Sequence, residues 1–336
     1  MRNTSLSRSR FAAGTLATFA SIAVVRAPAR AAQFQYVYGN DQSISSPTTV
    51  RAIQLWKAVE RKSGGHLSVK TFQDSQLGGD SQMLTQLRSG AMQFLTMVGA
   101  IMGNIVPASG IDSLGFAFKD TKTAFAAMDG DLGEYIRKEI AAKGMYAIPH
   151  PFDNGFRQIT ANKPIRTVAD LEGLKIRVPT APVFVELFRG LGASPVPINV
   201  SELYTALQTH VVDAEENALV NITQSKLYEV QKTLNFSNHA WSCWWFLVNQ
   251  EAWNALPPDI QAIVTSNVAK YAVFQRRDFE LQTAALADKL HRFGMQIYQC
   301  DSAALKAKLG PYYAKARDLF GSTAIGMLEK YSGKLG

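Results

Sequence analysis

The sequence predicts an α/β fold of two lobes, with doubly wound sheets and a long helix that spans both lobes. Three observations carry this prediction. Strand-like and helix-like segments alternate after Ala32, and the alternation restarts near Asn154. A helical pattern then opens at Pro257-Pro258-Asp259 and continues to about Arg292 without another Pro or Gly, far beyond the ~11–12 residues of an average helix. The 336 residues are enough for two lobes that each bury a core.

The first lobe is predicted from strands that alternate with helices. Its β-rich segments are 34–38, 66–72, 92–98 and 145–148. The first helix opens at Ser46-Pro47, because Pro suits a first turn, and should place Val50, Ile53 and Trp56 on one face. Further helices are expected at about 80–89 and 132–143. This βαβαβ order favours a parallel sheet.

The second lobe repeats the alternation. Its predicted strands are 174–178, 195–198 and 211–215, and its predicted helices are 182–190, 202–210 and 225–230. A strongly apolar strand at 243–248 follows. Ser201 is the expected N-cap of the helix at 202–210. The predicted domain organisation places residues 32–154 in the first lobe, with 243–282 returning to it. Residues 155–242 form the second lobe, which 283–336 complete.

Residues 1–31 have the pattern of an export signal peptide. Arg2, Arg8 and Arg10 precede an uncharged apolar stretch at 11–25, and Ala29-Arg30-Ala31 provides an A-x-A cleavage site. The stretch is short for a membrane span, and no later apolar run reaches ~20 residues. We therefore predict a periplasmic protein that does not itself span the membrane. An uncleaved anchor is the alternative, and the pattern does not distinguish Sec from Tat export.

Charge and cysteine content narrow the classes of partner. The net charge of +8 includes five arginines of the signal peptide and no acid there, so the mature chain carries 8 − 5 = +3. This chain has no cluster of Lys and Arg of the kind that binds nucleic acid or anionic lipid. Cys243 and Cys300 are far apart in sequence. Two buried thiols are the favoured interpretation, and pairing stays open.

The sequence contains no recognisable catalytic or metal-binding constellation. Its five histidines are scattered, and it has no nucleophile elbow, phosphate loop, Cys-x-x-Cys or dinucleotide-binding motif. Asp213, Glu215 and Glu216 gather carboxylates, as the solvated end of a strand also does. We therefore predict a binding protein without enzymatic activity, cofactor or metal.

Two arginines stand out because each lies where a predicted strand ends. Arg157 follows one strand, and Arg177 lies at the carboxyl end of 174–178. Ligands of α/β sheets bind beyond such ends, and a guanidinium group binds a carboxylate through two parallel hydrogen bonds. The helix that starts at Pro182 adds unpaired N–H groups that favour an anion. These residues indicate a carboxylate-binding cleft, although arginines at strand ends also form surface ion pairs.

The aromatic segment 239–246 admits two interpretations. In a strand, Trp241 and Trp245 share one face, and Trp244 points to the other. Core packing is one interpretation, because aromatic strands are usually buried. The other is that Trp241 or its neighbour lines the cleft as an apolar wall.

A longer pattern extends over nearly all of the mature chain. Its segments are Gln76-Leu77-Gly78-Gly79-Asp80, Asp153-Asn154-Gly155-Phe156-Arg157-Gln158, 164–179, Gly192-Ala193-Ser194-Pro195-Val196-Pro197, 201–208, 212–217 and 225–232. Their order and content resemble the solute-binding proteins of TRAP (tripartite ATP-independent periplasmic) transporters, the DctP-like family.

The resemblance implies a periplasmic-binding-protein-like fold whose lobes close by hinge motion on a small organic acid. It implies that Arg177 pairs with the ligand carboxylate, that Arg157 is the second arginine of the pocket, and that Asn217 contacts the ligand or orients Arg177. Glu215 and Ala218 replace the usual Gln and Pro of the family around this asparagine. It also implies delivery to membrane permease subunits, driven by an ion gradient and without ATP hydrolysis in this chain.

The identity of the acid stays open at the level of sequence. Val98 and Val200 stand where sialic-acid-binding members carry an acidic and an aromatic residue, which argues against a polyhydroxylated sugar acid. A dicarboxylate, a keto acid and an aromatic acid all fit the predicted arginine pair. Two other functions also stay open: a ligand-sensing periplasmic subunit of a signalling system, and a periplasmic enzyme.

Overall fold

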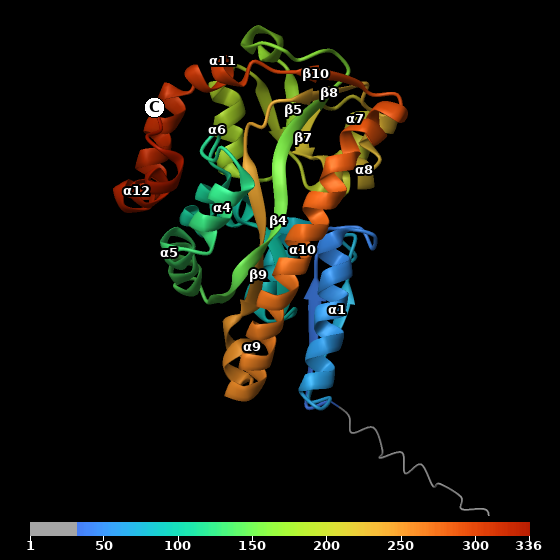
Figure 1. The fold of residues 1–336 in the computed structure, drawn as a ribbon, viewed down its shortest axis with the longest axis vertical. Helices are drawn as coiled ribbons and strands as arrows, with labels where there is room; N and C mark the ends of the chain where they lie inside the picture. The colour runs from blue at the N-terminus through green and yellow to red at the C-terminus, as the bar shows by residue number, and fades with distance from the viewer. Residues whose placement is uncertain (1–31) are drawn as a thin grey trace, which may run out of the picture. The chain divides into compact units, whose positions relative to one another are not determined.

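The computed structural model describes residues 32–336, so the predicted signal peptide, residues 1–31, lies outside the described part of the chain. The strands of the described part form two sheets that share the long strand β4 (Met145–Ala161). Figure 1 shows β4 in green passing from one sheet to the other, beside the orange helix α10 (Pro258–Arg292). The prediction of a two-lobed α/β fold is confirmed.

The first sheet has the strand order β2-β1-β3-β9-β4. Its members besides β4 are β1 (Phe34–Gly39), β2 (Leu67–Phe72), β3 (Phe94–Val98) and β9 (Trp241–Asn249). The first three strands are parallel, as the βαβαβ pattern predicts. Strand β9 enters from the second lobe and runs antiparallel to both β3 and β4, so the sheet is mixed.

Helix α1 (Pro47–Lys62) begins where the sequence indicates, because the Ser46 hydroxyl accepts a hydrogen bond from the backbone N–H of Thr48. The predicted buried face is wrong in part. Val50 is exposed, whereas the face that packs on the core contains Leu55, Trp56 and Val59. The apolar stripe is thus shifted around the helix, although its spacing is helical.

The second sheet continues β4 in the order β4-β7-β5-β6, and β8 pairs with β4 and β10. Its strands are β5 (Lys175–Val178), β6 (Ser194–Pro197), β7 (Ala214–Ala218), β8 (Thr233–Phe236) and β10 (Gln296–Gln299), with helices α6 (Pro182–Gly190), α7 (Val200–Gln208) and α8 (Leu219–Gln224). Asn199, not Ser201, is the N-cap of α7, because the helix begins two residues earlier than predicted. The predicted restart at Asn154 falls inside β4, which runs without a break.

Helix α10 spans 35 residues and packs against α1 and β4 near one end and against α8 and β10 near the other, as its uninterrupted pattern predicts. The remaining helices are α2 (Asp80–Ser89), α3 (Gly99–Met102), α4 (Thr121–Met128), α5 (Asp131–Ala141), α9 (Gln250–Ala255), α11 (Ser302–Ala307) and α12 (Gly310–Ser332). Within residues 32–336, every helix is too short or too polar to cross a membrane. Cys243 is buried, Cys300 is half-buried, and neither forms a disulfide.

The crossing between the two sheets is irregular at Asp153–Gly155. The pairing of β4 with β9 shifts register here, and Gly155 has a φ of 78°, which favours glycine. The buried Gln275 of α10 replaces the lost pairing: its amide nitrogen donates to the Asp153 carbonyl at 2.8 Å, and its oxygen accepts from the Asp153 N–H at 2.7 Å. Gln275 therefore connects α10 to β4 at the point where the pairing of β4 with β9 is irregular and the two sheets meet.

Candidate functional site

Three of the four residues predicted for the site line one small cavity. Arg157, Arg177 and Asn217 reach it from β4, β5 and β7. The loop after β1 and the end of β3 border the same space, so the carboxyl ends of strands from both sheets meet there. The cavity holds about 20 Å³ in this conformation, room for about one water molecule.

Arg177 is buried, with 1% of its surface exposed. Its Nε donates to the carbonyl of Ile198 at 2.8 Å, which fixes the side chain beside the end of β5. Its two terminal nitrogens make no hydrogen bond with any described residue, and no carboxylate of residues 32–336 lies within ion-pair distance of them. An arginine stays protonated even when it is buried. The two terminal nitrogens of Arg177 can therefore donate hydrogen bonds to an anion.

Arg157 differs because its Nε and Nη2 donors are already used. Its Nη2 donates to Glu216 Oε1 at 2.9 Å and to the Glu216 carbonyl at 2.8 Å, and its Nε donates to Oε2. His239 Nε2 lies 2.9 Å from the same Oε2, and Ser237 lies behind His239. Burial would raise the pKa of Glu216, but the charge of Arg157 and the hydrogen bonds with His239 and Arg157 together outweigh it and hold the pKa below its usual value. Burial lowers the pKa of His239, which favours the neutral imidazole.

Asn217 belongs to a chain of buried side-chain amides. Its Oδ1 accepts from Asn221 Nδ2 at 2.8 Å, and the same nitrogen donates to Asn154 Oδ1 at 3.1 Å. Asn154 in turn donates to Ser242 Oγ at 2.9 Å. Because the oxygen of Asn217 is occupied, its amide N–H₂ is the group that remains for a ligand at the cavity.

Two acids line the cavity that were not predicted as site residues. Asp41 follows β1, and Asp80, 4% exposed, is the first residue of α2. Burial raises the pKa of Asp41 to about 6. Burial, and then the charge of Asp41, raises the pKa of Asp80 well above its ordinary value. The place of Asp41 just beyond the carboxyl end of a strand is the signal that identifies it.

Trp241 does not line this cavity. Its ring packs against Phe118 and Phe125, with centroid distances of 5.8 and 5.1 Å. Trp244, which alternation places on the opposite face of β9, lines the cavity instead. Of the two interpretations of this segment, the structure places Trp241 among aromatic core residues and its neighbour at the cavity.

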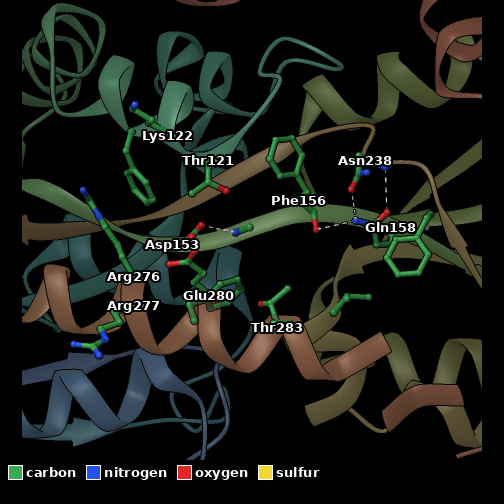
Figure 2. A pocket seen from close by; sticks show the side chains of 16 residues that line it. Thr121, Lys122, Asp153, Phe156, Gln158, Asn238, Arg276, Arg277, Glu280 and Thr283 are labelled. Carbon is green, nitrogen blue, oxygen red and sulfur yellow. Dashed lines mark hydrogen bonds between the residues drawn. The ribbon is translucent and has the colours of Figure 1, made fainter. Parts of the chain in front are cut away.

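A larger cavity of about 690 Å³ borders β4 as well and shares no lining residue with the small one. Figure 2 shows Phe156 and Gln158 of β4 lining it opposite Arg276, Glu280 and Thr283 of α10. Arg276 is already bound, since it donates to both oxygens of Asp129 and to the Pro151 carbonyl. The larger space therefore lacks the buried unpaired cation of the small cavity. Among residues 32–336, no cluster of His, Cys, Asp and Glu fits a metal ion.

Comparison with known proteins identifies the family. Residues 38–318 match the model of bacterial extracellular solute-binding proteins, family 7, also named DctP. The chain belongs to this family. Its members include the 2,3-diketo-L-gulonate-binding periplasmic protein YiaO of Escherichia coli, which is 27% identical over 84% of this chain and 86% of its own length. The sialic acid-binding periplasmic protein SiaP of Vibrio cholerae is 28% identical over 86% of this chain and 90% of its own length.

Solved structures of family 7 proteins have the same fold. The sugar acid binding protein of Advenella mimigardefordensis, in complex with galactonate, superimposes with a TM-score of 0.86 at 28% identity, covering 91% of this chain and all of the other. A TRAP periplasmic solute-binding protein of Sulfurospirillum deleyianum with bound succinate has a TM-score of 0.84 at 25% identity, covering 90% and 99%. The predicted TRAP family is confirmed. Since family 7 consists of binding proteins, the prediction of a protein that is not an enzyme is confirmed too.

Proposed function

We propose that this family 7 protein captures a small organic acid between its lobes, with Arg177 binding the carboxylate. The observation that carries the proposal is a buried guanidinium group whose terminal nitrogens have no partner among the described residues. A buried charge without a partner is costly, so its presence at a cavity favours a ligand of opposite charge. The related solved structures hold organic acids, galactonate and succinate among them.

Arg157 and Asn217 have supporting roles in this proposal. Glu216 and His239 hold Arg157 in place, and because Glu216 balances its charge, Arg157 adds a fixed hydrogen-bond donor beside Arg177 rather than net positive charge. The amide N–H₂ of Asn217 donates a further hydrogen bond to the bound acid. Trp244, rather than Trp241, is the apolar wall of the site.

Capture requires the lobes to part and close again. A cavity of about 20 Å³ is far smaller than a bound acid, so the ligand enters an open form. The bulge at Asp153–Gly155 is the proposed pivot. Opposite it, Asn104 donates to the Thr180 carbonyl at 2.6 Å, and Ser43 donates to Gln224 at 2.9 Å. These contacts hold the closed form together.

Export and delivery complete the proposal. The signal peptide at residues 1–31 directs the protein to the periplasm, and mass spectrometry of periplasmic protein should show a mature N-terminus at Ala32 or Gln33. The closed form then docks on the membrane permease subunits of a TRAP transporter. Lobe I comprises residues 32–154 and 243–282 in this scheme, and lobe II comprises 155–242 and 283–336.

Isothermal titration of the mature protein with a panel of organic acids tests the proposal. Arg177→Ala should weaken binding of the best acid by about 10²- to 10³-fold, the effect of removing one partner of a buried ion pair. Arg177→Lys should also bind poorly, because a point charge does not replace the planar fork. Arg189→Ala is the matched control, since the Arg189 side chain is 62% exposed. Near-normal affinity in a folded Arg177→Ala variant would place the carboxylate elsewhere.

A further inference from the structure

Asp41 and Asp80 line the cavity with few hydrogen bonds, although Asp41 is half-buried and Asp80 is 4% exposed. As the first residue of α2, Asp80 is favourably placed at a helix N-terminus, and within residues 32–336 burial and the interaction of its carboxyl group with that of Asp41 raise its pKa. Asp41 accepts a single bond, from Gln42 Nε2 at 3.0 Å. Neither acid forms an ion pair within the described residues. Buried polar groups normally have hydrogen-bond partners. Two carboxyl groups with so few hydrogen bonds at one cavity therefore favour a ligand that supplies further donors.

The position of Asp80 is set by a close approach of the two lobes. Gly79 precedes it, and a Cβ at that position would lie 3.1 Å from the side chain of Asn199, the N-cap of α7. The start of α2 therefore lies close to the lobe that carries Arg177. Asp41 and Asp80 therefore line the same cavity as the unpaired guanidinium nitrogens, from the opposite lobe. The cavity offers donors on one side and acceptors on the other.

This arrangement restricts what the remainder of a bound acid can be. An aspartate oxygen accepts hydrogen bonds, so it suits a hydroxyl or an N–H group. A second carboxylate in that place would meet like charges in a buried site, which is unfavourable. Burial raises the pKa of Asp41 to about 6 and that of Asp80 well above its ordinary value, so the pair tends to hold a proton, and a neutral hydroxyl can then donate to the ionised acid and accept from the protonated one.

We propose that Asp41 and Asp80 form a hydroxyl-binding subsite opposite Arg177, so that the site selects short hydroxylated monocarboxylic acids over dicarboxylic acids. The inference rests on the proposed function, because it takes the ligand carboxylate to be on Arg177. It revises the interpretation drawn from Val98 and Val200. These two residues also line the cavity, and their apolar side chains limit the length of the ligand without removing the acceptors.

Four acids with the same four-carbon chain provide the test: butanoate, 2,3,4-trihydroxybutanoate, succinate and 4-aminobutanoate. Titration calorimetry of the mature protein should rank the trihydroxy acid about 10- to 100-fold above butanoate, as expected for hydrogen bonds to charged acceptors. Succinate should bind more weakly than the trihydroxy acid. Tighter binding of succinate or of 4-aminobutanoate would overturn the hydroxyl assignment.

Variants separate this inference from the proposed function. Asp80→Asn and Asp41→Asn keep the size of the side chain, and they should reduce the ratio of the affinities for the trihydroxy acid and for butanoate about tenfold, because only the trihydroxy acid has hydroxyl groups for this subsite. An unchanged ratio in both folded variants would refute the subsite and leave the arginine clamp intact. Loss of all four acids in Arg177→Ala, with the ratio abolished in the aspartate variants, supports both. If wild type binds none of the acids, the proposed function fails, and the inference fails with it.

Discussion

The two cavities that border β4 differ in size and in how their polar groups are satisfied. The one beside Phe156 and Gln158 is about 690 Å³, and its half-buried arginine, Arg276, is paired. The one beside Asn154 and Arg157 is about 20 Å³, yet an unpaired guanidinium group and two under-used carboxylates line it. Under the proposed function, unsatisfied buried charge identifies the binding site better than empty volume does, because the cost of that charge is offset only where a ligand binds.

The largest effect that tests this comparison concerns the paired arginines on the two sides of β4. Arg157→Ala leaves Glu216 buried and charged, so the free energy of unfolding should fall by about 3–5 kcal/mol. In Arg276→Ala the partner, Asp129, is 29% exposed and reaches water, so the loss should be only about 1 kcal/mol. Urea unfolding of both variants measures the difference. Equal losses would show that the Arg157–Glu216 pair does not stabilise the folded protein more than the Arg276–Asp129 pair does.

The sequence predicts those parts of the molecule that depend on local pattern. Helix α10 follows from an unbroken run of helix formers, and Arg177 follows from its place at a strand end. Asp41, just after β1, has a signal of the same kind, although it was not among the predicted site residues. Asp80 could not be predicted in this way, because it lies at the start of a helix, α2, and no periodicity encodes its position beside the cavity of Arg177. Alternation in β9 separates Trp241 from Trp244, but it does not say which face meets the cavity.

A smaller effect concerns Glu215, the acid behind Arg177 in β7. It is fully buried, Thr160 donates to its Oε1 at 2.9 Å, and its Oε2 has no partner among the described residues. Burial raises its pKa to about 7, although the charge of Arg177 opposes the shift. The folded state therefore holds the proton more tightly than the unfolded state, and the unfolding free energy should fall as pH rises from about 4.5 to about 7.

Urea unfolding at pH 5 and at pH 7.5 measures this loss. Glu215→Gln should remove about 1–3 kcal/mol of the pH dependence, because the amide cannot ionise. Asp112 and Asp153 have raised pKa values as well, so a residual slope should remain in the variant. An identical slope in wild type and variant would mean that Glu215 is ionised throughout this pH range, and the field around Arg177 would then already be neutralised.

The smallest effect is expected on the side of β4 that faces the larger cavity. Thr283 of α10 lines the larger cavity, and its buried Oγ1 has no partner within residues 32–336. Thr283→Val removes an unsatisfied hydroxyl, so stability should rise slightly, by less than about 1 kcal/mol. Ligand affinity should stay within about twofold of wild type, because the larger cavity does not bind the acid in this scheme.

Thr160→Val is the matched change on the other side, where the Thr160 hydroxyl donates to the buried Glu215 at 2.9 Å. It should cost about 1–3 kcal/mol of unfolding free energy, since it removes the only hydrogen bond that the described residues make to this buried carboxyl group behind the site. Thermal unfolding and calorimetric titration with the best organic acid measure both variants. If Thr283→Val weakened ligand binding and Thr160→Val did not, the larger cavity would be the binding site, and the comparison between the two cavities would be reversed. The volume of a cavity would then predict the ligand-binding site of this protein better than a buried charge without a partner does.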